Sequence, residues 1–227
     1  MRRMAAADEY ARIVLASASP RRQRLIEWLC VPFVVRPTDV DEPLDLPLSP
    51  EELATHLAAS KALSGARHAK TDEVVLGFDT LVVLDGVLMG KPTSDEEARS
   101  MLSRLSGRHH QVVTGVAIAV RGALARSFAV TTDVEMRTLT PDEVEGWIAR
   151  GEHLGCAGAY NIEHHLARVT DDECFQNVAG LPLCHLYAEL ASGRLARLPG
   201  LTPPVARCDA ALGRACTLGP RVCGIMP

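Results

Sequence analysis

Four helix-capping sequences, separated by runs of β-branched residues, constrain the fold of this chain more than any other feature. Ser19-Pro20 places a hydroxyl side chain before a proline that suits the first turn of a helix. Three further segments carry the pattern of a capping box, with a hydroxyl residue three positions before a glutamate: Ser49–Glu52, Ser94–Glu97 and Thr140–Glu143. We therefore predict four helices, which follow these caps and end near Cys30, Lys70, Leu105 and Arg150.

The segments between the caps are typical of β-strands. The predicted strands are Ile13–Ala16, Glu73–Leu84, Val87–Met89, Gln111–Val120 and Ala123–Arg137. Asp85-Gly86 and Arg121-Gly122 predict tight turns, so each joins an antiparallel pair. Strands that alternate with helices, with hairpins among them, indicate an α/β fold in which helices flank a mixed, twisted sheet.

Length and charge narrow the class of protein. At 227 residues, 47% of them apolar, the chain can bury a large core without disulfide bonds. Its net charge of −4 argues against a nucleic-acid-binding surface spread over the whole protein, so an anionic ligand would need a local group of cations. No apolar run approaches the roughly 20 residues that span a bilayer. We expect a cytoplasmic protein that binds neither nucleic acid nor a membrane.

The C-terminal segment differs in composition from the rest of the chain. After Pro199 the sequence is rich in Pro, Gly, Cys and Arg and has no apolar periodicity, which predicts a poorly structured tail over 199–227, after a single domain over 1–198. Three of the seven cysteines lie in this tail, at positions 208, 216 and 223. Their wide spacing, without a nearby histidine, argues for free thiols and against a metal site.

The segment from Ser17 to Arg22 is the first candidate site. A strand ends there, a turn of small residues follows, and a helix begins with two arginines in its first turn. Free backbone N–H groups and the helix dipole favour an anion at this point, and they disfavour cations. Arg21 and Arg22 therefore oppose the local preference, and their forked guanidinium groups suit phosphate oxygens. Two solvated surface arginines are the alternative.

Acidic and basic residues elsewhere form a second set of candidates. Asp79 and Thr80 interrupt an apolar strand, where a carboxylate is normally excluded unless it is paired or reactive. Lys61 falls within a predicted helix and Lys91 follows a hairpin; either could simply be solvated. The loop over 39–42 contains Asp39, Asp41 and Glu42, and it could be a solvated loop or could hold a divalent metal.

Taken together, these segments resemble the Maf family of nucleoside triphosphate pyrophosphatases. The matching stretches occur in the family's order, from about Ile13 to Leu190: SASPRR, VDEP, ASKA, GFDTLVV, GKP, LSGRHHQVVTGVAI, CAGAY and NVAGLPL. The resemblance implies a Maf/ITPase-like fold with two lobes and a deep nucleotide-binding cleft between them. It also implies a homodimer, and an enzyme that cleaves a nucleoside triphosphate to the monophosphate and pyrophosphate.

The resemblance further assigns roles to individual residues. Asp79 would be the general base, with Lys61 and Lys91 as catalytic cations. Glu42 and Asp79 would hold a divalent cation, Mg²⁺ or Mn²⁺. The residues implied in substrate binding are Ser17, Ser19, Arg21, Arg22, Thr80 and Glu163.

The choice of base remains open between two subfamilies. Arg21 and Thr80 resemble the members that act on dTTP and UTP, which we favour, with modified nucleotides as further possible substrates. Glu163 resembles the members that act on 7-methyl-GTP, because the dTTP/UTP type carries a glutamine there. A nucleotide-binding regulator of cell division with little turnover is another alternative, although pure binding does not need a base such as Asp79.

Overall fold

The computed structural model describes residues 10–225. One mixed sheet forms its centre, with the strand order β2-β1-β3-β5-β6-β7 and with β4 paired to β3. β1 pairs in parallel with β2 and β3, and the remaining pairs are antiparallel. This arrangement confirms the predicted mixed sheet. The strands are β1 (Arg12–Leu15), β2 (Phe33–Val35), β3 (Glu73–Leu84), β4 (Val87–Met89), β5 (His109–Val120), β6 (Ala123–Met136) and β7 (Ala167–Arg168).

Each of the four predicted caps begins a helix. Ser49 and Thr140 form reciprocal capping boxes with their glutamates. At the predicted Ser94–Glu97 box only half of the pattern forms, because the Glu97 carboxylate accepts from the backbone N–H of Thr93 instead of that of Ser94. The helices are α1 (Pro20–Ile26), α2 (Pro50–Ala66), α3 (Asp95–Leu105), α4 (Pro141–Ala149), α5 (Phe175–Val178), α6 (Leu183–Ala191), α7 (Val205–Leu212) and α8 (Leu218–Cys223).

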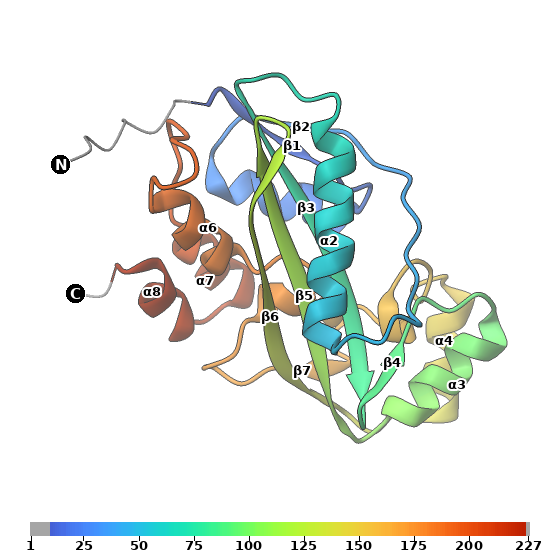
Figure 1. The fold of residues 1–227 in the computed structure, drawn as a ribbon. Coiled ribbons are helices and arrows are strands. Elements are labelled where there is room, and N and C mark those ends of the chain that lie inside the picture. Colours follow the sequence, from blue (N-terminus) through green and yellow to red (C-terminus); the bar gives the residue numbers. More distant parts are fainter. Residues whose placement is uncertain (1–9, 226–227) are drawn as a thin grey trace.

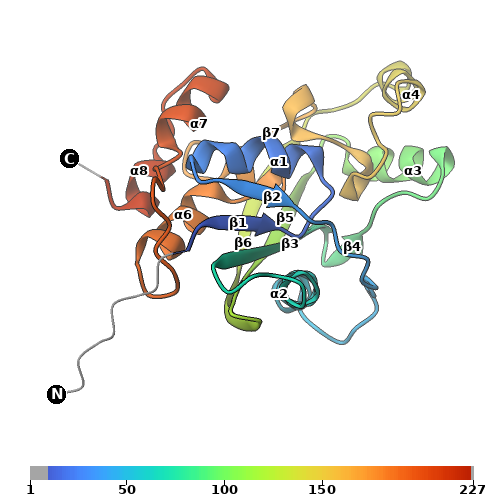
Figure 2. The ribbon, with the colours of Figure 1, turned by 90° about the horizontal axis from the view of Figure 1, so that it is seen from above.

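The helices cover the two faces of the sheet unequally. Of the helices within residues 10–225, α2 alone lies against one face, and α1 lies on the opposite side of β1 and β2 (Figures 1 and 2). The strand side chains alternate accordingly: Ile13 and Leu15 belong to the main core cluster, whereas Val14 belongs to a smaller cluster with alanines of α2. The main core therefore lies on the α1 side of the sheet.

Two glycines let α2 approach the sheet closely. A Cβ atom at Gly77 would overlap the backbone oxygen of Ala58, and one at Gly115 would overlap that of Ala54. Gly77 is on β3 and Gly115 faces β3 from β5, so both lie directly beneath α2. The close contact places the middle of α2 beside the middle of β3, which matters for the site described below.

The C-terminal segment contradicts one prediction. Residues 199–227 were predicted to be a poorly structured tail, but α7 and α8 form within this segment, and α8 packs against α6 (Figure 1). Val205 and Cys208 are buried. The prediction is wrong for residues 205–223 because tertiary contacts, not a long apolar periodicity, hold these short helices. Residues 1–9 of the predicted domain and residues 226–227 of the predicted tail lie outside the described part of the chain.

Sequence reasoning also missed β2 and β7, which are two or three residues long. α2 ends at Ala66, four residues before the predicted end at Lys70. Over residues 10–225, none of the helices combines the length and the apolar character that crossing a bilayer requires.

Candidate active site

A cavity of about 420 Å³ opens at the carboxyl end of β1. One wall is the β1–α1 turn together with residues 178–180, and the facing wall is formed by residues 154–160, which include the short helix η2 (Ala157–Ala159) and pack against α3. The cavity thus lies between two parts of the chain, as the predicted two-lobed shape requires. Most of the predicted site residues line it: Ser17, Ser19, Arg21, Arg22, Glu42, Lys61, Asp79, Thr80 and Lys91.

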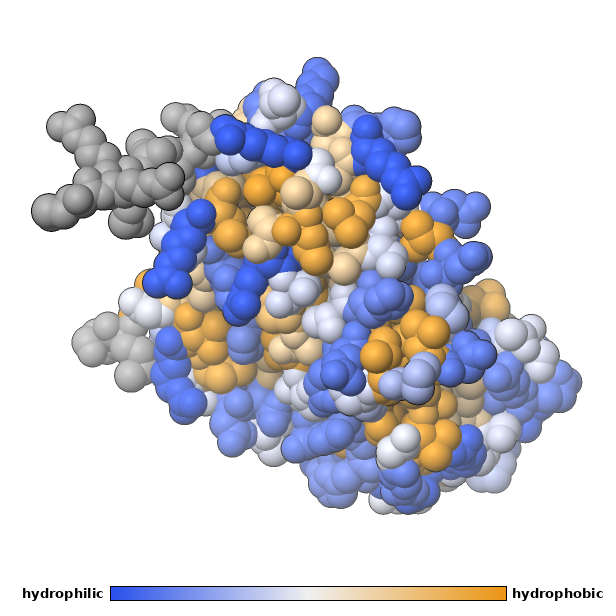
Figure 3. All heavy atoms as spheres, viewed as in Figure 1, coloured by the Kyte–Doolittle hydropathy of each residue, from blue (hydrophilic) through white to orange (hydrophobic). Residues whose placement is uncertain are grey.

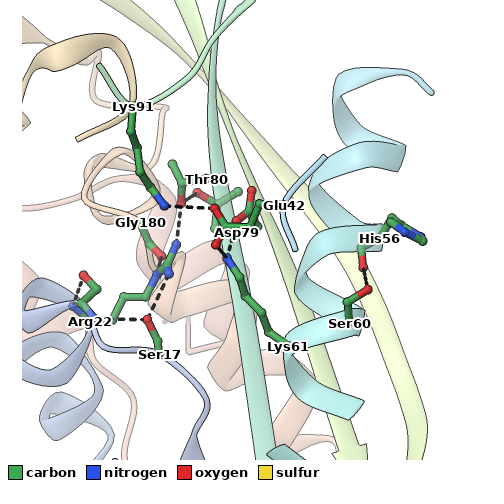
Figure 4. A network of polar contacts seen from close by, with 12 residues as sticks. Ser17, Arg22, Glu42, His56, Ser60, Lys61, Asp79, Thr80, Lys91 and Gly180 are labelled. Carbon is green, nitrogen blue, oxygen red and sulfur yellow. Dashed lines mark hydrogen bonds and ion pairs between the residues drawn. The ribbon is translucent and has the colours of Figure 1, made fainter. Parts of the chain in front are cut away.

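A buried lysine lies between two carboxylates at the floor of this cavity. Lys61 Nζ is 2.6 Å from Asp79 Oδ1 and 2.7 Å from Glu42 Oε1. Lys61 and Asp79 are only 7% and 5% exposed. Lys61 points from α2 towards β3, and Lys91 approaches Glu42 from the other side at 3.1 Å (Figure 4). The four side chains form a continuous chain of alternating charge.

The charges in this chain stabilise one another. Burial disfavours the ionised form of Glu42, but hydrogen bonds and ion pairs with Lys61 and Lys91 outweigh it and hold the pKa of Glu42 below its usual value. Glu42 is therefore a carboxylate at neutral pH. A carboxylate between two ammonium groups keeps both lysines in place at the cavity wall.

Arg22 is fixed by three neutral oxygen atoms. Its Nε donates to the carbonyl of Gly180 at 2.8 Å, and its two terminal nitrogens donate to the hydroxyls of Ser17 and Thr80 at 3.1 and 3.0 Å. The Thr80 hydroxyl in turn contacts the Thr114 hydroxyl at 3.0 Å. Three of the five N–H groups of the guanidinium are thereby used, which leaves two for an anion in the cavity.

Burial lowers the pKa of Arg22 but does not remove its positive charge. The lowered pKa is about 10, so the side chain remains a cation at neutral pH. The neutral oxygens around Arg22 satisfy hydrogen bonds but do not neutralise its charge. This is the expected state of a group that binds an anionic ligand.

The turn that precedes α1 contributes hydroxyl groups. The Ser17 hydroxyl accepts from the backbone N–H of Ser19 at 3.3 Å, and the Ser19 hydroxyl caps α1 by accepting from the N–H of Arg22 at 3.5 Å. Arg21 extends over the opposite side of the cavity, where its Nη1 contacts the sulfur of Cys156 at 3.4 Å. The turn thus directs its two arginines to different walls of the cavity.

Glu163 lies apart from the residues just described. It belongs to the short helix η3 (Ile162–His164), and both of its carboxylate oxygens accept from Arg24 Nη2, at 3.0 and 2.7 Å. The described residues that line the cavity do not include Glu163. Its fixed partner is a surface arginine.

Sequence reasoning missed two features of the cavity. The Gly180 carbonyl, in a loop where the glycine has a φ of +97°, orients Arg22. Leu154 lines the cavity mouth although it is 68% exposed. The turn sequence around Gly180 was a usable signal for the first, whereas an isolated leucine gives no signal for the second.

The carboxylates fit a hard divalent cation. Glu42 and Asp79 both contact the same Lys61 nitrogen, so their oxygens lie close together at the cavity wall. Mg²⁺ is commonly held by one or two carboxylates together with substrate phosphates and water. Within residues 10–225, no group of three or more His, Cys, Asp or Glu side chains is arranged to hold a metal ion. A cation here would therefore complete its coordination with oxygens of the substrate.

Comparison with known proteins places the chain among curated relatives that share one name. It is 44% identical to a dTTP/UTP pyrophosphatase from Moorella thermoacetica, over 80% of this chain and 94% of the relative. It is 40% identical to the dTTP/UTP pyrophosphatase of Halalkalibacterium halodurans, over 75% of this chain and 90% of the relative. Among solved structures, a HAM1 protein from Coxiella burnetii is similar with a TM-score of 0.39 and 20% identity, over 55% of this chain and 72% of that chain.

A match along most of the sequence shows to which family the chain belongs. A sequence model of the family described as Maf-like protein matches residues 12–193. This range contains every strand of the sheet and every side chain of the cavity described above. The chain belongs to the Maf-like protein family.

Proposed function

We propose that this protein is a nucleoside triphosphate pyrophosphatase that hydrolyses dTTP and UTP to the monophosphate and pyrophosphate. The observation that carries the proposal is the buried Lys61–Asp79 pair, joined to Glu42 and Lys91, at the floor of a cavity edged by two arginines. The names of the curated relatives, at 44% and 40% identity, support the same activity.

Asp79 is the proposed general base. Its carboxylate faces the cavity, and it would accept a proton from a water molecule as the water oxygen attacks phosphorus. The phosphoanhydride bond between the α- and β-phosphates then breaks, and pyrophosphate leaves with the electron pair. Lys61 holds the Asp79 carboxylate in position through the 2.6 Å contact.

The cations of the site would bind the triphosphate and the leaving pyrophosphate. Arg22 presents two free N–H groups from a preorganised position, and Arg21 and Lys91 approach from other walls of the cavity. Preorganised cations in a partly dry site stabilise developing negative charge more than the same groups in water. Glu42 and Asp79 would hold Mg²⁺ or Mn²⁺, and a bound divalent cation supplies charge neutralisation on the phosphate oxygens.

The position of Glu163 supports a pyrimidine nucleotide as substrate. Glu163 was the residue that favoured the 7-methyl-GTP alternative, but its carboxylate is engaged by Arg24 outside the cavity lining. The residues that resemble the dTTP/UTP type, Arg21 and Thr80, both line the cavity. A panel of dTTP, UTP, 7-methyl-GTP and the common triphosphates, assayed by pyrophosphate release, tests this choice. Faster hydrolysis of 7-methyl-GTP than of dTTP and UTP would contradict it.

We further propose a cytoplasmic homodimer, as the family resemblance implies. Apolar side chains gather in patches between hydrophilic ones on the face that contains α2 (Figure 3). Leu63 on α2 and Val35 on β2 are among the exposed large apolar residues. Light scattering coupled to gel filtration measures the mass in solution, and a monomer at micromolar concentration would contradict the dimer. Cell fractionation tests the location.

A further inference from the structure

Five of the seven cysteines gather around the C-terminal helices, away from the nucleotide cavity. Cys184 is on α6, Cys208 is on α7 and Cys223 ends α8. A small cleft between these helices is lined by four thiol side chains, those of Cys174, Cys184, Cys208 and Cys216. α6, α7 and α8 lie side by side at one end of the molecule (Figure 1). Three of the five cysteines lie beyond residue 193, where the family match ends.

Cys184 lies at the centre of this thiol cluster. Cys208 lines the same cleft, and the thiols of Cys208 and Cys223 are both close enough to affect the pKa of Cys184. Cys223 Sγ also lies 4.0 Å from the carbonyl oxygen of Cys184. All of these thiols are free in the structure. A disulfide needs two sulfurs that can approach each other without movement of the backbone, so Cys208 and Cys223 are the two candidate partners of Cys184.

Packing and exposure distinguish Cys223 from Cys208 as the partner of Cys184. α8 packs directly against α6, so the backbones that carry Cys184 and Cys223 are close to each other. Cys184 and Cys208 are both buried, at 5% exposure, whereas Cys223 is half-buried. A reagent from solution therefore reaches Cys223 first, and Cys223 Sγ lies beside the backbone of Cys184.

We propose that Cys184 and Cys223 form a reversible disulfide that ties α8 to α6, with a small-molecule disulfide as the oxidant. The Cys223 thiolate attacks the oxidant, forms a mixed disulfide and releases one thiol. The Cys184 sulfur then attacks Cys223 Sγ and releases the second thiol. The protein loses two electrons and two protons, and both are taken up by the oxidant, which is reduced to two thiols.

A zinc site is the other chemistry that clustered thiols suggest. Within residues 10–225, however, these side chains are not arranged as a group of three or more metal ligands. Burial also raises the pKa of Cys223 to about 12, so thiolate, which zinc binding and thiol–disulfide exchange both require, forms increasingly as the pH rises. Because no third ligand is arranged beside these thiols among the described residues, the cluster favours cross-linking over metal binding.

The cross-link would act on the stability of the fold. It would close a loop from Cys184 to Cys223 and so restrict the unfolded chain. Cys184 is in the first turn of α6, shortly after Gly180, whose carbonyl orients Arg22. The disulfide would therefore anchor the helix that follows this wall of the cavity, without contacting the cavity itself.

The test exposes the reduced, full-length protein to oxidised glutathione under native conditions. After free thiols are alkylated, digestion without reductant should yield one linked peptide pair that contains Cys184 and Cys223. The melting temperature should rise by about 5–15 °C, as expected for a loop of this length in a domain of this size, and dithiothreitol should reverse the rise. Cys223→Ser should abolish both effects, whereas Cys30→Ser, at an exposed cysteine outside the cluster, should preserve them.

Three outcomes would overturn the proposal. The first is a mixed disulfide with glutathione at Cys223 that never resolves to an internal cross-link. The second is a linked pair that joins Cys184 to Cys208 instead. The third is stoichiometric zinc in the purified protein, released when the thiols are alkylated, which would show that the cluster is a metal site.

Discussion

Lys61 on α2 and Asp79 on β3 form an ion pair of 2.6 Å in which both side chains are almost fully buried. The two residues come from different elements, and the close approach of α2 at Gly77 and Gly115 brings them together. Burying two charges has a cost that a good contact must offset. A buried ion pair at the floor of a cavity is therefore better explained by a role in catalysis than by a contribution to the stability of the fold.

The first prediction concerns this pair. Lys61→Met keeps much of the apolar stem but removes the charge, which leaves the buried Asp79 carboxylate without its cation partner, whereas Glu42 keeps its contact with Lys91. We expect a loss of about 3–5 kcal/mol in the free energy of unfolding, from breaking one side of a buried pair. Urea unfolding measures it. Lys91→Met, at a lysine whose side chain is 54% exposed, is the matched control and should cost much less. Equal losses for the two variants would contradict the role of burial.

The second prediction concerns the phosphate-binding role of Arg22. Arg22→Ala should weaken the binding of the triphosphate and of pyrophosphate alike, because the proposed contact is to phosphate. A charged hydrogen bond contributes about 1.5–3 kcal/mol, and calorimetric titration with both ligands measures the loss. Arg24→Ala removes a guanidinium two positions away that pairs with Glu163 outside the cavity, and it should leave both affinities unchanged. A loss for one base but not for another would make Arg22 a specificity residue.

The third prediction concerns Glu163. Because its carboxylate is held by Arg24 and does not line the cavity, Glu163→Gln should leave the ratio of kcat/KM for UTP over a guanine nucleotide unchanged. If Glu163 instead faced the base, an amide would form better hydrogen bonds with uracil than a carboxylate does. The ratio would then change by a factor that corresponds to about 1–3 kcal/mol. Steady-state kinetics with both substrates distinguish these outcomes.

The fourth prediction concerns the close approach of α2. A methyl group at Gly115 would overlap the backbone of Ala54, which cannot move independently of the helix, so Gly115→Ala should destabilise the fold by about 1–3 kcal/mol or more. Gly146→Ala is the control, since Gly146 lies within α4 and its nearest neighbour is the far end of the Arg150 side chain. That variant should be neutral or stabilising by up to about 1 kcal/mol. Thermal unfolding of both variants gives the comparison.

Local chemistry made most of the fold predictable. Hydroxyl caps and turn glycines act over a few residues, so the starts of α1 and α2 and the bounds of β3 and β4 agree with the sequence-based prediction. α7 and α8 were missed because contacts with distant parts of the chain hold them, and a composition rich in Pro, Gly and Cys gives no local sign of those contacts. The edge strands β2 and β7, two or three residues long, were too short to show an alternating pattern of apolar residues.

The site was predictable in its members but not in its connections. The sequence marked Asp79 as an acid in an apolar strand, but nothing in the spacing of Lys61 and Asp79 shows that they meet. That contact depends on the packing of α2 onto β3. The pairing of Arg24 with Glu163, 139 positions apart, is likewise a consequence of tertiary structure. Local patterns thus identified most of the predicted residues that line the cavity, whereas packing decides their partners.

The most direct test of the proposed activity is the turnover of dTTP and UTP by the protein and by Asp79→Asn, measured as pyrophosphate release at saturating Mg²⁺ and substrate. The amide keeps the shape of the side chain and can still contact Lys61, but it cannot take a proton from water. We expect the original protein to release pyrophosphate and the variant, still folded by circular dichroism, to be slower by about 10²-fold or more. Turnover by the folded variant close to that of the original protein would contradict the assignment of Asp79 as the base.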